Sequence, residues 1–120
     1  MTAEHIATAN LKATPRRGAI RIWLEGGKLL AAGFNSGDVK YRHELTDEGV
    51  LILTIDENGT NKVTMATPRK PGQLRPIVDM TCRGCTEHFT GGRMDVVYGV
   101  DGELGVIRIS DAKTTTKEGK

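Results

Sequence analysis

The pattern of apolar residues predicts short β-strands along most of the chain. Val39–Leu45 alternates apolar and polar residues, which is the period of a half-buried strand. Val50–Ile55 is almost continuously apolar and predicts a more buried strand. Further strands are expected at Ile20–Leu24, Lys62–Met65, Ile77–Met80, Met94–Tyr98 and Gly105–Ile109. Only Lys28–Ala32, which ends at Gly33, and Cys82–Phe89 favour short helices. The fold class predicted from this pattern is mainly β with short helices.

Two parts of the chain repeat the same order of residues. Ile22, Phe34 and Gly37 each have an identical residue 55 positions later, at Ile77, Phe89 and Gly92. A strand, one helical turn and a hairpin cannot bury an apolar face alone, whereas two copies can cover each other. The repeat therefore predicts a small pseudo-two-fold β-barrel that is built from two tandem strand, helical turn and hairpin units.

The prolines and the polar segments divide the chain around this barrel. The predicted organisation is a flexible basic arm at 1–18, repeat one at 19–66, a linker at 67–75, repeat two at 76–110 and a polar tail at 111–120. A chain of 120 residues is long enough for one core and too short for two independent ones. Residues 19–110 are therefore expected to form a single domain.

The first repeat contains a short motif at the helix-to-strand turn, which runs Leu29-Leu30-Ala31-Ala32-Gly33-Phe34-Asn35-Ser36-Gly37-Asp38-Val39. It resembles the swapped-hairpin barrels of the SpoVT and AbrB transition-state regulators, and more closely their SymE-like branch. The second repeat keeps Phe89 and Gly92 but has His88 and Arg93 where the first has Gly33 and Asp38. The resemblance implies a DNA-binding protein in which one chain supplies both interleaved halves, with a role such as transcription regulation or a SymE-like association with nucleic acid.

Charge is distributed unevenly, although the net charge is only +2. Each repeat begins with basic residues and ends with acidic ones, so a two-fold axis would gather the basic segments on one face. Such a face is the electrostatic footprint of a nucleic-acid binder, while charges that merely solvate strand edges and turns are the alternative interpretation. The residues predicted to bind nucleic acid, with DNA as the expected partner, are Arg16, Arg17, Arg21, Lys28, Lys40, Arg42, Arg69, Lys70 and Arg75.

The only two cysteines form a Cys-x-x-Cys motif. Cys82, Cys85 and His88 have the spacing to reach one zinc ion, which would be a cofactor, although a fourth ligand is not evident. Cysteines at the start of a helix also favour thiol exchange. Against both, Cys85 aligns with Leu30 of the first repeat, which predicts a buried apolar role. Two cysteines this close together form no disulfide framework of a secreted domain, in agreement with a reducing compartment.

The sequence contains no recognisable catalytic set, so a non-enzymatic function is expected. The alternative to DNA binding is a protein-interaction module, of the kind found in phages or mobile elements, that inhibits or modulates another macromolecule. It would use the acidic residues Glu44, Asp47, Glu48, Asp101 and Glu103. With no apolar run that could span a bilayer, we expect a cytoplasmic protein without a membrane partner, either a monomer or a homodimer.

Overall fold

The protein is built from two antiparallel sheets. The computed structural model describes residues 7–90, 92–100 and 104–112, except for the side chain of Arg16. The six-stranded sheet has the order β1 (Ala7–Lys12), β9 (Arg93–Tyr98), β10 (Val106–Asp111), β5 (Leu51–Ile55), β4 (Lys40–Leu45) and β6 (Asn61–Lys62). The four-stranded sheet has the order β2 (Thr14–Arg16), β3 (Ala19–Glu25), β8 (Pro76–Cys82) and β7 (Thr64–Met65). One helix, α1 (Gly27–Ala31), and one 3₁₀ turn, η1 (Gly84–Glu87), join strands.

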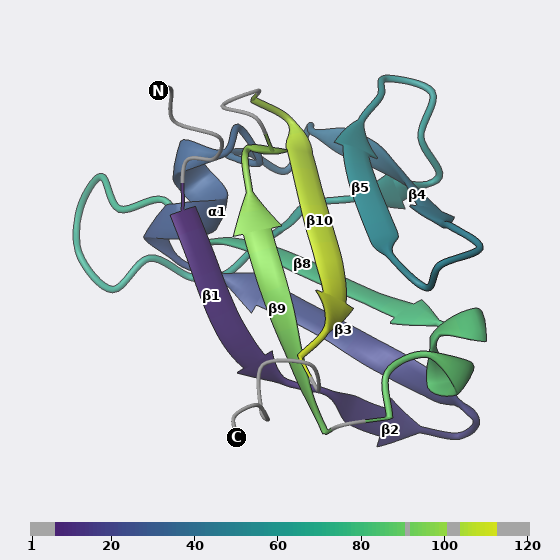
Figure 1. Cartoon of the computed structure of the whole chain (residues 1–120). Coiled ribbons are helices and arrows are strands. Elements are labelled where there is room, and N and C mark those ends of the chain that lie inside the picture. The colour runs from purple at the N-terminus through teal and green to yellow at the C-terminus, as the bar shows by residue number, and fades with distance from the viewer. Residues whose placement is uncertain (1–6, 91, 101–103, 113–120) are drawn as a thin grey trace, which may run out of the picture.

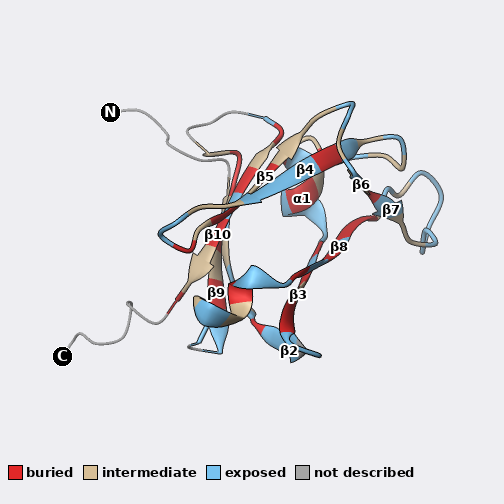
Figure 2. Cartoon of the chain, turned by 90° about the vertical axis from the view of Figure 1, so that its right-hand side faces the viewer, coloured by how far each residue is buried: buried red, intermediate tan, exposed pale blue. Residues whose placement is uncertain are grey.

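The apolar core lies between the sheets, where β9 and β10 cross in front of β3 and β8 (Figure 1). Buried and exposed residues alternate along β3 and β8, so one side of the four-stranded sheet faces the core and the other faces outward (Figure 2). The largest fully buried side chains are Tyr41, Tyr98, Phe34, Ile20, Ile22, Leu24, Leu29, Leu51, Leu53, Met94, Ile107 and Ile109. The expectation of a mainly β protein with short helices is confirmed.

The sheets are not closed into a barrel within the described part of the chain. The strands β1 and β2 follow one another across Ala13, and β6 and β7 follow one another across Val63, with one strand of each pair in each sheet. The chain therefore bends from sheet to sheet at these two residues, both of which are buried. No ladder of hydrogen bonds connects the sheets there, which is why the predicted barrel is instead two open layers.

The predicted flexible arm at 1–18 is wrong for residues 7–16. Ala7–Lys12 pairs with β9 along its whole length, and the Asn10 amide donates a hydrogen bond to Asp95 Oδ1 at 2.8 Å. Thr14–Arg16 then pairs with the start of β3. The predicted tail also starts too early, because β10 extends to Asp111 and Ala112 is buried. Most of the tail, residues 113–120, lies outside the described residues.

The helix predicted at Cys82–Phe89 is only the 3₁₀ turn η1, because Cys82 is still part of β8, whereas several other local predictions agree with the structure. The helix α1 lies within one residue of its predicted start and end, and Gly33 follows it with a φ of 101°, a conformation that glycine adopts without a steric penalty. The proline-rich segment at 67–75 lies in the loop between β7 and β8. Among the described residues, no helix has the length and apolarity needed to cross a membrane.

Candidate nucleic-acid interface

The outward side of the four-stranded sheet carries an exposed aromatic residue among charged ones. Along β3, Ile22 and Leu24 point into the core, so Arg21 and Trp23 point outward. On β8, Asp79 lies opposite Trp23 and Thr81 lies opposite Arg21. The indole is 40% exposed, which makes it one of three large apolar side chains that the described residues leave in solvent. A tryptophan in this position is available for contact with a ligand.

Arg21 is held by the strand beside it. Its Nε donates to Asp79 Oδ1 and its Nη2 to Asp79 Oδ2, both at 3.0 Å. These hydrogen bonds to the carboxylate raise the pKa of the guanidinium above its ordinary value, so Arg21 stays charged. The guanidinium also lies 4.8 Å from the centre of the Trp23 ring, in a cation–π contact. Asp79 thus orients Arg21, and Arg21 in turn supports the indole.

Two further arginines lie at one end of this outward side. Arg17 and Gly18 form the two-residue turn between β2 and β3, and Arg83 follows β8 directly. Arg17 has a φ of 53°, the only positive value among the described residues other than glycine. Arg17 and Arg83 border a shallow pocket of about 230 Å³ together with Ala19 and Thr81. A bulky cation at a position that favours glycine is consistent with a functional requirement for its charge.

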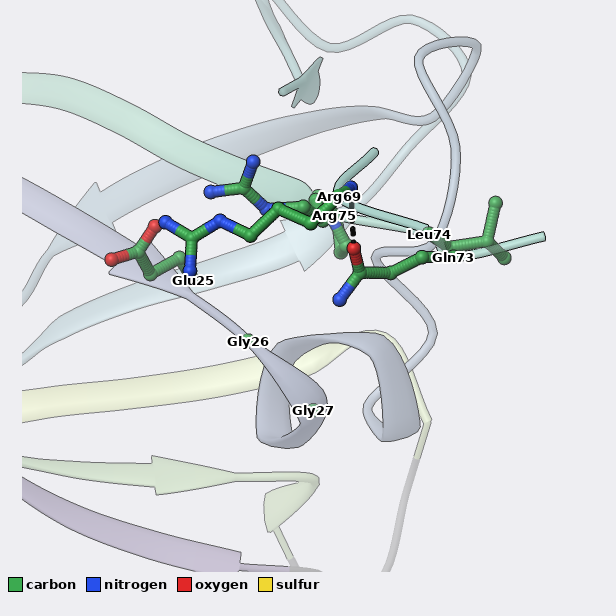
Figure 3. A pocket seen from close by; sticks show the side chains of 8 residues that line it. Glu25, Gly26, Gly27, Arg69, Gln73, Leu74 and Arg75 are labelled. Carbon is green, nitrogen blue, oxygen red and sulfur yellow. Dashed lines mark hydrogen bonds between the residues drawn. The ribbon is translucent and has the colours of Figure 1, made fainter. Parts of the chain in front are cut away.

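The loop between β7 and β8 supplies cations at the other end. Arg69, Gln73 and Arg75 border a pocket of about 410 Å³ beside Glu25 and the start of α1. The Arg69 and Arg75 side chains extend in the same direction, toward Glu25, while Leu74 points away (Figure 3). The backbone N–H of Arg69 donates to Gln73 Oε1 at 2.7 Å, which folds the loop back on itself. Lys70 is exposed in the same loop. The basic face is hereafter the set Arg17, Arg21, Arg69, Lys70, Arg75 and Arg83.

The structure separates the predicted nucleic-acid-binding residues into groups. Arg17, Arg21, Arg69, Lys70 and Arg75 belong to the basic face, whereas the Arg16 side chain lies outside the described residues. Lys28 donates to the backbone oxygen of Thr8 at 2.8 Å, at the junction of α1 and β1. Lys40 and Arg42 lie on β4, which belongs to the six-stranded sheet, so they are not part of the sheet that carries Arg21. On β4, Arg42 Nε donates to Asp56 Oδ2 at 3.2 Å.

Of the acidic residues considered as an alternative surface, three are described. Glu44 is exposed on β4, and Asp47 and Glu48 are exposed in the turn that follows it. Asp101 and Glu103 lie outside the described residues. Glu44, Asp47 and Glu48 therefore lie together at one end of the six-stranded sheet.

The cysteine motif forms a disulfide. Cys82 and Cys85 are bonded, their Cα atoms are 5.5 Å apart, and both side chains are buried, as the alignment of Cys85 with Leu30 predicts. The His88 ring packs against Gly49. Two sulfurs in a disulfide offer no thiolate to zinc, and the described residues contain no group of three metal-ligating side chains. The structure thus brings the two sulfurs together but not the three predicted ligands.

The residues predicted to bind nucleic acid do not include Trp23 and Arg83, which the structure places on or beside the outward side of the four-stranded sheet. The signal for Trp23 was present, because it occupies the polar phase of a strand whose apolar phase is Ile20, Ile22 and Leu24. Arg83 had no such signal, because it lies within the Cys-x-x-Cys motif. Its place beside Arg17 depends on the pairing of β3 with β8, which joins residues far apart in the chain.

No protein-family model matches this sequence, and searches of curated proteins and of solved structures returned no significant match.

Proposed function

We propose that this protein is a non-enzymatic nucleic-acid-binding module, with a regulatory role of the transcription-factor type, that contacts its ligand through the basic face. The observation that carries the proposal is the charge of this surface. Its six cations lie on β3 or in the turns and loops that border β3 and β8, and the outward residues of these two strands include two carboxylates, Glu25 and Asp79. Cations at this density neutralise phosphates and release counterions, the main source of affinity for nucleic acid.

The strand registers support the proposed internal duplication. Trp23 and Leu24 lie opposite Asp79 and Val78, and Ile52 and Leu53 lie opposite Arg108 and Ile107. In both cases the directly opposed residues are 56 and 54 positions apart in the chain, so each residue lies diagonally across from the residue 55 positions away, the spacing of the sequence repeat. Two copies related by a two-fold axis pair their equivalent strands antiparallel in this way. This is the arrangement that the resemblance to AbrB and SymE proteins implies.

The test is a binding titration across a salt series with a fluorescent random duplex and a single strand of equal length. We expect binding whose affinity falls steeply as salt rises, because each neutralised phosphate adds to the slope. The variant Arg17→Glu with Arg83→Glu should bind at least about tenfold more weakly at low salt. The control Lys62→Glu with Arg108→Glu changes the charge equally on exposed residues of the six-stranded sheet and should bind like the parent.

Two results contradict the proposal. Equal losses in both variants would mean that net charge, and not the basic face, governs binding. Absence of binding to either nucleic acid at low salt would exclude the function. The acidic turn with Asp47 and Glu48 would then be the surface to test against a protein target.

A further inference from the structure

Trp23 borders a recess at a free edge of the four-stranded sheet. Strand β2 pairs only with Ala19–Arg21, so within the described residues the rest of β3 has no strand partner on that side. The recess lies there, between β3 and β1, and has a volume of about 340 Å³. Ala9 and Leu11 form its apolar wall, and Glu25 and Lys28 add polar groups. It therefore combines an aromatic ring and apolar side chains with groups that can hydrogen-bond.

The ring that borders this recess is held in place before any ligand arrives. Arg21 is itself fixed by two hydrogen bonds to Asp79. It contacts the indole without lining the recess. A side chain that is already ordered loses little conformational entropy when it binds a ligand. This arrangement suits a flat partner that stacks on the ring.

Lys28 is placed to contact an anion near such a partner. One proton of its ammonium group is used by the backbone oxygen of Thr8, at 2.8 Å, and two protons remain for other acceptors. The basic face continues from the recess in both directions, with Arg17 and Arg83 at one end and the β7–β8 loop at the other. A charged backbone that follows these cations would pass beside Trp23.

We infer that the preferred ligand is single-stranded nucleic acid, with an unpaired base stacked on Trp23 in the recess and the flanking phosphates on the basic face. The inference rests on the proposed function and adds the form of the ligand. Bases in a duplex are stacked on one another and have no face free for a side chain, whereas an unpaired base can stack on tryptophan with little dependence on sequence. Phosphate contacts alone would not distinguish the two forms.

The experiment uses Trp23 as its own reporter, since the chain has no other tryptophan. Oligo-dT and a duplex of equal length are titrated into the full chain at matched salt, with tryptophan fluorescence and the anisotropy of labelled nucleic acid recorded. We expect oligo-dT to quench the fluorescence and to bind about tenfold more tightly than the duplex. Trp23→Ala should weaken binding of oligo-dT by about 10-fold to 100-fold and binding of the duplex less than about twofold. Trp23→Phe, which keeps a stacking ring, should restore most of the affinity.

Urea unfolding of each variant verifies that the chain remains folded. Equal affinity for the two forms, or full binding of oligo-dT by folded Trp23→Ala, would overturn the stacking inference and leave the proposed function standing. Binding of neither form would refute both.

Discussion

On the outward side of each sheet the described residues form an ion pair, Arg21 with Asp79 and Arg42 with Asp56, and these two pairs differ in their surroundings. On the four-stranded sheet, Arg21 and Asp79 share two contacts of 3.0 Å and support the exposed ring of Trp23. On the six-stranded sheet, Arg42 and Asp56 share one contact of 3.2 Å, and Arg42 makes no cation–π contact with a described residue. Charge alone therefore does not mark a binding surface. A functional surface is indicated where an ion pair orients a group that has no structural need to be exposed.

The outward sides of the two sheets also differ in how charge is distributed across them. Across the six-stranded sheet, one row places Glu44, Ile52, Arg108 and Val97 side by side, so its charges alternate with half-buried apolar residues. The basic face instead has an excess of cations at both ends of β3. A mixed row is typical of a solvated sheet, whereas an excess of one sign attracts a ligand of the opposite sign.

The largest expected effect is a loss of stability, and it concerns glycines in the turns and loops that border the two sheets. A Cβ added at Gly59, in the turn after β5, would lie 2.4 Å from the backbone carbonyl atoms of Tyr41. Gly59→Ala should therefore lower the free energy of unfolding by about 3 kcal/mol, because backbone must move. Gly72, in the basic loop, has open space around it and a φ of 78°, so Gly72→Ala should cost only about 1 kcal/mol. Urea unfolding of both variants measures the difference, and equal losses would contradict it.

Reversing charge in the basic loop should have the next largest effect. Arg69→Glu with Lys70→Glu places two anions where the proposed ligand carries phosphates, so affinity at low salt should fall by about 100-fold. The matched variant Lys40→Glu with Arg42→Glu changes residues of the six-stranded sheet that the sequence also predicted to bind. Its affinity should change less than about twofold. If the Lys40→Glu, Arg42→Glu variant lost more than about twofold in affinity, the interface would extend across both sheets.

The inner sides of the sheets differ in their response to pH, because both buried tyrosines belong to the six-stranded sheet. Burial raises the pKa of Tyr41 and of Tyr98 to about 12. Below pH 10 the phenol is protonated in both the folded and the unfolded chain. As the pH rises from 10 to 12, the unfolded chain loses this proton first. The free energy of unfolding should therefore fall in this window, by on the order of 2 kcal/mol per tyrosine.

Urea unfolding at several pH values measures this fall. Tyr98→Phe should remove the contribution of its own hydroxyl, and an unchanged pH dependence in that variant would contradict the assignment.

A smaller effect should separate stability from binding at Arg17. Because its φ is 53°, Arg17→Gly should raise the free energy of unfolding by about 1 kcal/mol. The same change removes a cation of the basic face and should lower affinity for nucleic acid severalfold. Calorimetry and a binding titration on one sample test both. Loss of stability would contradict the backbone strain assigned to Arg17, and unchanged affinity would show that Arg17 has no role in the interface.

The smallest expected effect is a gain in affinity for nucleic acid, whereas the other charge changes in the basic face weaken binding. Asp79→Asn removes a negative charge from the basic face and should strengthen binding by about threefold, since Arg21 is then free to meet a phosphate. Asp56→Asn removes the equivalent charge beside Arg42 and should leave the affinity unchanged. Weaker binding by Asp79→Asn would mean that holding Arg21 against Trp23 matters more than freeing its charge.

Local pattern predicted most of the strands, because each depends on residues close together in the chain. The helix before Gly33 and the strand at Val39–Leu45 are examples. Strand β1 was missed because its inward residues, Ala7, Ala9 and Leu11, are mostly small and its partner β9 follows more than 80 residues later. The site was predicted only in part for the same reason. Whether Arg21 and Arg42 share a surface depends on which sheet each strand joins, and distant pairings decide that.

Chemical-shift mapping of the backbone amides tests the central claim most directly. The folded chain is titrated with an oligonucleotide, and the shifted amides are located on the two sheets. We predict that they cluster on the outward residues of β3 and β8, on the Arg17–Gly18 turn and in the β7–β8 loop, while β4 and β5 remain unchanged. Shifts confined to β4 and β5, or none at a concentration that saturates binding, would contradict the proposal that the basic face is the interface.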